Sequence, residues 1–207
     1  MVKLSILIPV WNQSVLVIKA LNNIPRRDDI EILVRDDGST DNTLANLYTY
    51  QYIHPELNLT ISANGENKGV AWTKNRLLEE SCGEYFTIHD SDDYVYTEAY
   101  NSLIDQLYDI TEDILCFDLE GNDGRVFMIR QESIHSLCSQ SARFMRRKIV
   151  MDNNIRWPEH IKAGDDWNFM EDLLRQKPTH KFTGVVAYHY NFPREGSLYN
   201  LQSRGLI

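Results

Sequence analysis

The sequence lacks the glycine-rich phosphate-binding loops of the common nucleotide-binding folds. It contains no Gly-x-Gly-x-x-Gly segment and no Gly-Lys-Ser/Thr loop, so neither a dinucleotide-binding fold nor a P-loop is supported. The loop after the first apolar run, residues 10–13, has no glycine at all. That absence also counts against a nucleotidyltransferase, because such enzymes usually place their phosphates on a glycine-rich loop after the first strand.

Long apolar runs are missing as well. No stretch approaches the roughly 20 apolar residues that a membrane-spanning helix needs. The run from Leu4 to Val10 is too short for the core of a signal peptide, and it contains Pro9. We therefore expect a soluble, cytoplasmic protein without a membrane span.

Cysteine and positive charge are both scarce. The three cysteines, Cys82, Cys116 and Cys138, are widely spaced, which is typical of reduced thiols and matches no zinc-binding spacing. The formal net charge is −9, which argues against a general surface for nucleic acids or anionic membranes. With 43% hydrophobic residues among 207, the chain is long enough for one domain with a substantial core.

The first half of the chain alternates between short apolar runs and amphipathic segments. The patterns predict strands at 3–8, 30–34 and 57–62 and a further strand that follows Gly83 and runs to Asp90. Helices are predicted at about 14–23, 42–52 and 70–80, with caps at Asn12 or Ser14 and at Ser39, Thr40 or Asp41. This alternation predicts an α/β fold, with a parallel sheet covered by helices on both faces.

Polar residues follow three of these strands at the point where each strand ends. They occupy residues 9–12, 36–39 and 90–93. Ligands of parallel sheets bind outside the carboxyl ends of the strands, so we expect the three loops to converge on one edge. Each loop alone could be an ordinary turn or helix cap, but their coincidence favours a binding site.

The loop after the fourth strand concentrates negative charge. Asp90, Asp92 and Asp93 lie within four positions, and such carboxylates repel one another and are costly to leave unpaired. Mn²⁺ or Mg²⁺ would relieve the repulsion, because these cations favour oxygen ligands and keep coordination sites free for substrate phosphates. The alternative is an acidic turn in which Asp93 caps the next helix.

Taken together, these segments resemble the inverting GT-A glycosyltransferases of family 2. The resemblance rests on residues 5–12, 31–41, 66–69 with 74–75, 90–93, 164–169, 188–190 and 194–198, in matching order and spacing. It implies a Rossmann-like three-layer sandwich with a mostly parallel central sheet and a small mixed sheet on the acceptor side. It also implies a single domain, in which residues 1–95 bind a nucleotide-sugar and residues 96–207 form the acceptor side and a C-terminal lid.

The resemblance further implies a nucleotide-sugar donor, most often a UDP-sugar, and a divalent metal that neutralises the diphosphate leaving group. Asp92 would be the main metal ligand. Asp90 would contact the ribose or assist the metal, Asp93 could substitute for either, and His189 could reach the diphosphate or the metal. A lone histidine at a strand end is otherwise a structural residue.

Other positions are implied to bind the nucleoside and diphosphate. Asp37 would accept the uracil N3–H, and Asp36 would support its turn. The remaining expected donor-binding residues are Pro9, Val10, Asn12, Lys68, Asn75, Arg76, Ser91, Arg194 and Ser197, the last two from a loop that would close over the donor.

Asp165 and Asp166 are the candidates for the acid–base step. Inversion needs a base that takes the proton of the acceptor hydroxyl, and a carboxylate serves when burial or a neighbouring charge raises its pKa. The family has Glu-Asp here with the second acid as base, so the resemblance implies Asp166 as base and Asp165 in support. Either acid could equally cap a helix predicted at 167–176.

The second half gives weaker patterns. We predict a helix at 97–108, a hairpin of strands at 113–118 and 126–129, and a last strand at 185–190. Residues 139–150 are predicted as a helix whose cations, Arg143, Arg146, Arg147 and Lys148, form either a solvated face or a patch for an anionic acceptor.

The expected function is therefore a metal-dependent inverting glycosyltransferase with no redox cofactor. The expected acceptor is a glycan or lipid-linked saccharide. Three alternatives remain open, namely transfer to hydroxymethylated bases of DNA, nucleotidyl transfer, and sugar-nucleotide binding without catalysis. The net charge of −9 counts against DNA.

Overall fold

A computed structural model describes residues 1–133, 140–161 and 164–192, and within them nine strands form one sheet. The strand order is β3-β2-β1-β4-β8-β6-β9-β5, and β7 pairs with β6 outside this path. The strands are β1 (Leu4–Val10), β2 (Ile30–Asp36), β3 (Leu59–Ala63), β4 (Tyr85–Ile88), β5 (Tyr94–Val95), β6 (Ile114–Gly121), β7 (Val126–Phe127), β8 (Arg143–Arg146) and β9 (His180–Tyr190).

The strands of the first half run parallel, as the sequence predicts. β1 pairs with β2 on one side and with β4 on the other, and β2 pairs with β3. Every residue of β1 is buried, which is what an apolar strand in the middle of a covered parallel sheet requires. Because these strands point the same way, their carboxyl ends, and the polar loops that follow them, lie at one edge.

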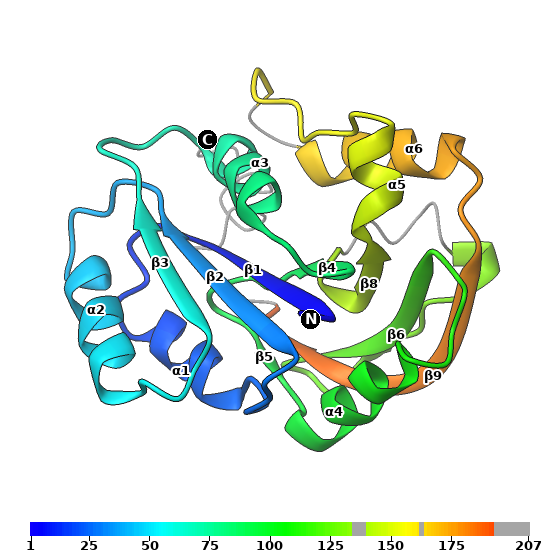
Figure 1. Ribbon diagram of the computed structural model, residues 1–207, viewed down its shortest axis with the longest axis horizontal. Coiled ribbons are helices and arrows are strands. Elements are labelled where there is room, and N and C mark those ends of the chain that lie inside the picture. The colour runs from blue at the N-terminus through cyan, green and yellow to red at the C-terminus, as the bar shows by residue number, and fades with distance from the viewer. Residues whose placement is uncertain (134–139, 162–163, 193–207) are drawn as a thin grey trace.

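Helices cover both faces of the sheet (Figure 1). They are α1 (Leu16–Asn23), α2 (Thr43–Ile53), α3 (Val70–Glu80), α4 (Thr97–Gln106), α5 (Arg147–Asp152) and α6 (Asp165–Arg175). α1 connects β1 to β2, and α2 connects β2 to β3, so the chain moves in one direction along the sheet. Because such crossovers are right-handed, both helices lie on the same face of the sheet. α3 returns from β3 to β4 and lies on the opposite face, where α5 and α6 also lie.

The second half extends the same sheet with mixed strand directions. β8 runs antiparallel to β4 and β6, β9 runs parallel to β6, and β5 runs antiparallel to β9. The expected α/β architecture is thus confirmed, with a sheet that becomes mixed and curled beyond β4. In the described part of the chain, no helix is long and apolar enough to cross a membrane.

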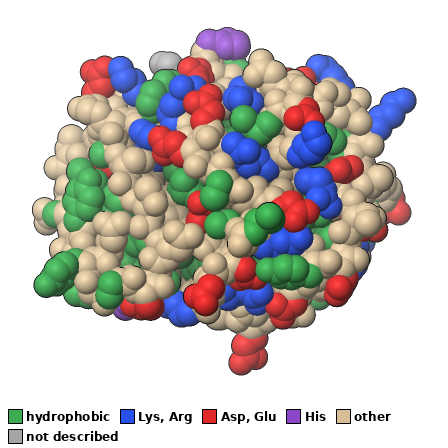
Figure 2. Space-filling model, in the orientation of Figure 1, with side chains coloured by type: hydrophobic (Ala, Val, Ile, Leu, Met, Phe, Trp, Pro, Cys, Tyr) green, Lys and Arg blue, Asp and Glu red, His purple; other side chains and the backbone are tan. Residues whose placement is uncertain are grey.

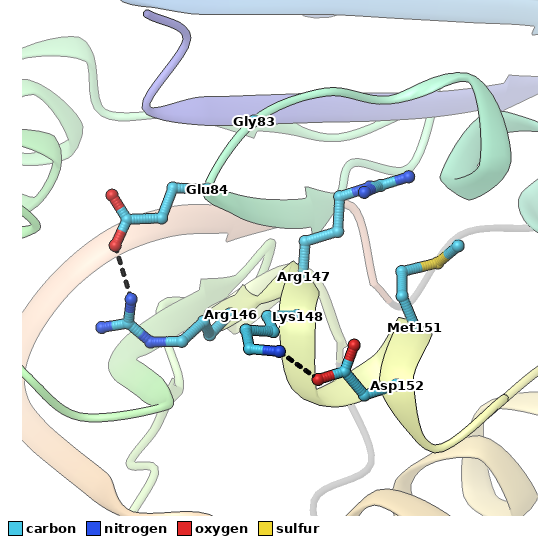
Figure 3. A pocket seen from close by; sticks show the side chains of 7 residues that line it. All are labelled: Gly83, Glu84, Arg146, Arg147, Lys148, Met151 and Asp152. Carbon is cyan, nitrogen blue, oxygen red and sulfur yellow. Dashed lines mark hydrogen bonds and ion pairs between the residues drawn. The ribbon is translucent and has the colours of Figure 1, made fainter.

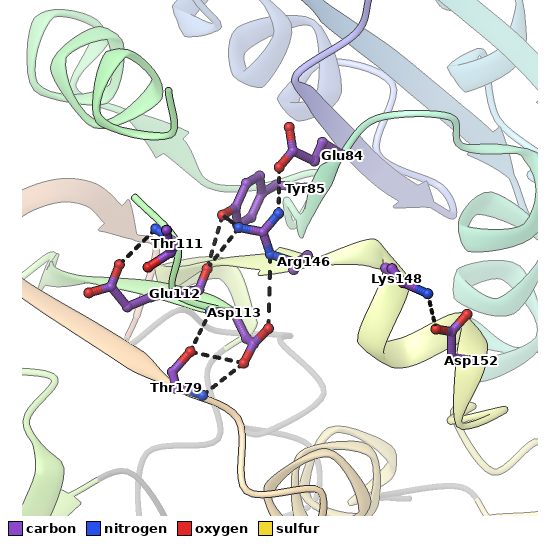
Figure 4. A network of polar contacts seen from close by, with 9 residues as sticks. All are labelled: Glu84, Tyr85, Thr111, Glu112, Asp113, Arg146, Lys148, Asp152 and Thr179. Atoms are coloured by element: carbon purple, nitrogen blue, oxygen red, sulfur yellow. Dashed lines mark hydrogen bonds and ion pairs between the residues drawn. The ribbon is translucent and has the colours of Figure 1, made fainter. Parts of the chain in front are cut away.

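The helix predicted at 139–150 is wrong. Residues 140–142 form a short 3₁₀ turn, β8 follows, and only the six residues of α5 are α-helical. Arg143 has no exposed surface, while Arg146 at the other end of β8 pairs with Glu84 and Tyr85 (Figure 4). A strand places these side chains differently from a helix, so the predicted cationic face does not exist.

The predicted side-chain cap of α1 is also wrong. The helix begins at Leu16, and no side chain caps it. Asn12 instead takes a left-handed conformation with φ of 51°, and its side chain reaches the loop after β2. At the second predicted cap, Asp41 Oδ1 accepts a hydrogen bond from the Thr43 N–H at 2.9 Å.

Gly38 lets the loop after β2 approach the loop after β3. Its φ is +71°, and an added Cβ would lie 2.5 Å from the carbonyl carbon of Glu66. We expect Gly38→Ala to lower the free energy of unfolding by about 2 to 3 kcal/mol, because both strain and overlap result. Urea denaturation measures the change.

Gly65→Ala is the matched control for Gly38→Ala. A Cβ at Gly65 would meet no atom within 4 Å, so its effect should stay within about 0.5 kcal/mol. Equal effects of the two substitutions would contradict the proposed close approach at Gly38.

Candidate active site

The loops after β1 and β2 are locked together at the carboxyl edge of the sheet. Asn12 Oδ1 accepts hydrogen bonds from the Thr40 N–H at 2.8 Å and the Asp41 N–H at 3.4 Å. In return, the Asn12 N–H donates to Ser39 Oγ at 2.8 Å. Pro9 and Val10 lie in the buried end of β1. The next side chain, Trp11, is 52% exposed, so an aromatic ring lies open at this edge.

Asp37 holds the third loop of the edge in place. Its Oδ1 accepts hydrogen bonds from Asn64 Nδ2 at 2.7 Å and from the Lys68 N–H at 2.8 Å, and its Oδ2 accepts from the Gly69 N–H at 2.9 Å. The carboxylate that the resemblance assigns to the nucleobase is therefore already bonded within the protein. This explains why Asp37 is almost fully buried, with 4% exposure.

Asp36 has a different environment. Its Oδ2 accepts a hydrogen bond from the Ser39 N–H at 2.9 Å, which supports the turn as predicted. Among the described residues, Asp36 Oδ1 is buried without a hydrogen-bond partner. A buried acceptor of this kind is rare, since nearly all such groups are satisfied, and it marks the place where a ligand donor would be most favourable.

The structure gives different surroundings to the three other predicted donor-binding residues of this region. Lys68 is 44% exposed and pairs with Glu66 near the edge. Asn75 is instead buried on α3, where its amide exchanges two hydrogen bonds with the backbone of Trp157, at 2.9 and 3.0 Å. Asn75 therefore does not line the nucleotide edge, which corrects its predicted placement. The neighbouring Arg76 pairs with Glu79 on the same helix.

The acid loop after β4 has an inward and an outward part. Asp93 is 3% exposed, and its carboxylate accepts hydrogen bonds from Tyr188 Oη at 2.8 Å and from the Asn191 N–H at 2.7 Å. Asp90 Oδ2 accepts from Ser141 Oγ at 3.0 Å, and Ser91 is also buried. Asp92 is half-buried. Asp93 is buried and bonded on both oxygens, whereas Asp90 and Asp92 are partly exposed, so these two are more accessible to a cation.

Burial perturbs the acid loop strongly. Desolvation raises the pKa of Asp90 to about 6, and the charge of Asp92 adds to the effect while Lys74 opposes it. Desolvation also raises the pKa of Asp93, with the charges of Asp90 and Asp92 in the same direction. The ionised form of these carboxylates is therefore disfavoured in the loop, and a bound cation would favour it.

Tyr188 anchors the acid loop to β9, a role that the sequence did not reveal. Its hydroxyl lies 3.1 Å from His89 Nδ1, accepts a hydrogen bond from the Asp90 N–H at 3.2 Å and donates to Asp93. His189 follows it, so its side chain leaves the opposite face of the strand. The His189 ring stacks on the Tyr94 ring, with 4.2 Å between ring centroids. The sequence signal for Tyr188 was its place in the motif at residues 188–190, which did not reveal its role.

Asp165 and Asp166 begin α6. The helix starts directly after Gly164, which has φ of 80°, and no side chain caps it, so both acids lie in the first turn. Lys74 Nζ on α3 donates to Asp165 Oδ2 at 2.8 Å and to Asp166 Oδ1 at 2.6 Å. Desolvation raises the pKa of Asp166, although the Lys74 ammonium opposes the rise. A carboxylate with a raised pKa suits a general base.

The predicted lid residues Arg194 and Ser197 lie outside the described residues. The four cations of the predicted patch, by contrast, lie within the described residues. A pocket of about 310 Å³ opens beside Glu84, Arg146, Arg147, Lys148 and Asp152 (Figure 3). It is near the amino end of β4, the end opposite to the acid loop.

The cations of this pocket are already engaged. Arg146 pairs with Glu84, Lys148 pairs with Asp152, and Arg147 Nε donates to Ser81 Oγ at 3.0 Å. Figure 2 shows basic and acidic side chains interleaved on this face. Lys148 and Asp152 form an exposed pair on α5, which agrees with a solvated helix face for this short segment. The four predicted cations do not form a concentrated anion-binding patch.

The described geometry can be compared with known proteins. Residues 5–176 match the profile of glycosyl transferase family 2. The chain belongs to this family. A curated relative in family 2 is the poly(ribitol-phosphate) beta-N-acetylglucosaminyltransferase TarS of Staphylococcus aureus, 27% identical over 95% of this chain and 36% of the relative. Another is the poly(ribitol-phosphate) beta-glucosyltransferase of Bacillus spizizenii, 26% identical over 94% of this chain and 33% of the relative. The chain thus spans about a third of their length.

Solved structures show the same fold. A fragment of TarS, residues 1–349, in complex with UDP-GlcNAc superposes with a TM-score of 0.81, at 24% identity, over 94% of this chain and 60% of that chain. The mannosyltransferase PcManGT of Pyrobaculum calidifontis, in complex with GDP-Man and Mn²⁺, gives a TM-score of 0.73 at 20% identity, over 94% of this chain and 58% of that chain. The expected membership of family 2 is thereby confirmed.

Tyr188→Phe tests the anchor of the acid loop in this family 2 protein. The substitution removes the hydroxyl from Asp93, Asp90 and His89 and leaves a buried carboxylate short of a donor. We expect the free energy of unfolding to fall by about 1 to 3 kcal/mol, measured by urea denaturation. Tyr48→Phe is the control, because Tyr48 is 49% exposed. Equal stability of the two variants would contradict the anchor.

Proposed function

We propose that the protein is a metal-dependent inverting glycosyltransferase that moves a sugar from a UDP-sugar to an acceptor hydroxyl. The observation that carries the proposal is the meeting of two acid groups at one buried lysine. Asp165 and Asp166 bond to Lys74 directly, and Asp90 is near enough for its charge to raise the pKa of that lysine. A donor-side acid loop and a candidate base therefore lie in one site, which a sugar-binding module would not need.

The nucleoside end of the donor is assigned to the loops after β1 and β2. Asp36 Oδ1 lacks a partner among the described residues and would accept a nucleobase N–H. The exposed ring of Trp11 and the ammonium of Lys68 lie at the same edge. The complexes of TarS with UDP-GlcNAc and with UDP support a uridine donor for this chain.

The acid loop fits a hard divalent cation. Among the described residues, no three His, Cys, Asp or Glu side chains form a preformed metal cluster. Mn²⁺ and Mg²⁺ in phosphate-binding sites are commonly held by one or two carboxylates together with substrate oxygens. Asp90 and Asp92 would hold the ion, which would neutralise the diphosphate as it leaves. The Mn²⁺ in the mannosyltransferase structure supports a divalent ion as the metal.

Asp166 is assigned as the general base. It would take the proton of the acceptor hydroxyl while the hydroxyl oxygen bonds to the anomeric carbon and the bond to the diphosphate breaks with its electron pair. Attack opposite to the leaving group inverts the anomeric centre. Asp165 shares the Lys74 ammonium with Asp166 and would keep the first turn of α6 negatively charged during the step.

The acceptor is the hydroxyl of a cell-surface polymer. The names of both curated relatives specify poly(ribitol-phosphate), so a phosphodiester-linked polyol is our first candidate, ahead of a lipid-linked saccharide. Transfer to DNA loses support, because Arg143 is buried, Arg146 and Lys148 are paired with acids, and Arg147 donates to Ser81.

Thermal shift with UDP and Mn²⁺ tests the donor and metal site. UDP at about 100 times its dissociation constant adds roughly 2.7 kcal/mol to the folded state, which raises the melting temperature by about 5 to 10 °C for a domain of this size. We expect this shift only when Mn²⁺ is present and expect GDP to give less.

Two substitutions sharpen the thermal-shift test. Asp92→Asn should abolish the Mn²⁺-dependent part of the shift. Asp109→Asn, at an exposed carboxylate in the turn after α4, should leave it intact. A shift of the same size in Asp92→Asn would remove this residue from the metal site, and no shift with any nucleotide would refute the donor assignment.

Asp166→Asn separates catalysis from binding. The amide keeps the shape of the side chain but accepts no proton, so turnover should fall by about 10²- to 10⁴-fold. Affinity for UDP, measured by calorimetry, should change less than about threefold. Unchanged turnover would exclude Asp166 as base, and a wild-type protein that binds UDP without any transfer would be a binding module instead.

A further inference from the structure

Lys74 is a charged residue in a buried position. Its side chain is 4% exposed, and it projects from the middle of α3, a helix that packs on β1 and β2. The ammonium reaches across 91 and 92 positions of sequence to the two acids that begin α6. Desolvation lowers the pKa of Lys74, but the charges of Asp166 and Asp165 outweigh it and the pKa is raised, so the lysine stays charged.

The residue after Lys74 makes a second connection to the same part of the chain. Asn75 clamps the backbone of Trp157, and the indole of Trp157 stacks on Phe169 of α6 at 4.0 Å between ring centroids. Trp157 Nε1 also donates to Gln140 Oε1 at 2.9 Å. α6 is therefore held toward α3 through Trp157, which also faces the Asp166 carboxylate and lowers its pKa. Lys74 is the charged group that meets the same carboxylate.

Stability alone does not account for the ionic contact. A buried ion pair is often no more stabilising than apolar residues of the same volume, because desolvation offsets the attraction. The side chain of Asp166 is 44% exposed, so without a partner it would sample several rotamers at the mouth of the site. A charge-assisted hydrogen bond of 2.6 Å from a buried donor restricts it to one.

We propose that Lys74 is a positioning residue of the transfer reaction, which holds the Asp166 carboxylate in the orientation that receives the acceptor proton. This inference rests on the proposed function. Lys74 acts through Asp166 and touches neither the acceptor nor the nucleobase. It also joins the two substrate sides, because the helix that carries it begins at the loop that Asp37 fixes.

Lys74, Asp165 and Asp90 are charged groups near Asp166, and they do not all change its pKa in the same direction. Lys74 on α3 lowers its pKa, and its neighbour Asp165 on α6 raises it. Asp90 after β4 is a like charge, and the charge of Asp166 raises the pKa of Asp90. Loss of Lys74 should therefore move the acid limb of the pH–rate profile to higher pH, whereas loss of the Asp165 charge should move it to lower pH.

The test compares Lys74→Met, Lys74→Arg and Asp165→Asn in the whole protein. Turnover and the pH profile of sugar transfer are measured together with calorimetric affinity for UDP. We expect Lys74→Met to lower kcat on the order of 10²-fold, since misplacement of a catalytic group by about 1 Å has that effect, while UDP affinity changes less than about threefold. Lys74→Arg, which keeps the charge, should restore part of kcat and keep the acid limb in place.

A double substitution shows whether Lys74 acts through the base. In an Asp166→Asn background, Lys74→Met should cause no further loss of kcat, because the group that it positions is gone. A further loss of equal size would overturn the proposal, and so would a fall in UDP affinity that matches the fall in kcat. Lys148→Met is the matched control, because Lys148 makes an ion pair with Asp152 but is 77% exposed, and its activity should equal wild type.

The remaining outcomes are also decisive. Should Lys74→Met fail to fold, Lys74→Gln takes its place, and a kcat of transfer equal to wild type in that variant overturns the proposal. Transfer that survives Lys74→Met undiminished overturns this inference alone. Absence of both UDP binding and transfer in the wild-type protein refutes the proposed function itself.

Discussion

Repulsion among carboxylates at one edge of the sheet is the constraint on which this structure depends. Asp37 is compensated by backbone N–H groups of the next loop, and Asp93 by Tyr188 and Asn191. The acids of α6 are compensated by Lys74. Burial still raises the pKa of both Asp90 and Asp93. Hydrogen bonds thus hold the acids that build the scaffold, and the acid loop after β4 keeps carboxylates whose ionised form the proposed cation would stabilise.

The topology explains how distant residues supply those compensating groups. After β4 the chain forms the short strand β5, residues 94–95. The strand that pairs with β5 is β9, which comes near the end of the chain. This path places Tyr188 beneath the acid loop. α3 has the complementary role on the other face, since it follows the loop held by Asp37 and then supports the first turn of α6. Hydrogen bonds from Tyr188 and from Lys74 therefore join the two proposed substrate sides, the donor side and the acceptor side.

Much of the first half was predictable because its patterns are local. The helix predicted at 70–80 has those bounds in the structure, and the parallel strands are displaced by a few residues at most. The second half was less predictable. The segment containing Arg143 has helix-forming neighbours, yet it becomes a strand because β4 and β6 both offer it hydrogen-bonding edges. No pattern within ten residues contains that information, and the burial of an arginine in a strand runs against its average preference.

By itself, the sequence determined the α/β class, the converging acidic loops and the family, because each depends on local periodicity or on the order and spacing of short motifs. Only the tertiary structure decided which acids face inward, that Tyr188 and not His189 supports the acid loop, and that Lys74 meets Asp165 and Asp166. The physical reason is that a side chain's partner across the sheet, or on a helix about 90 positions away, depends on how the elements pack. The free energy of such a contact depends on burial, which no local pattern encodes.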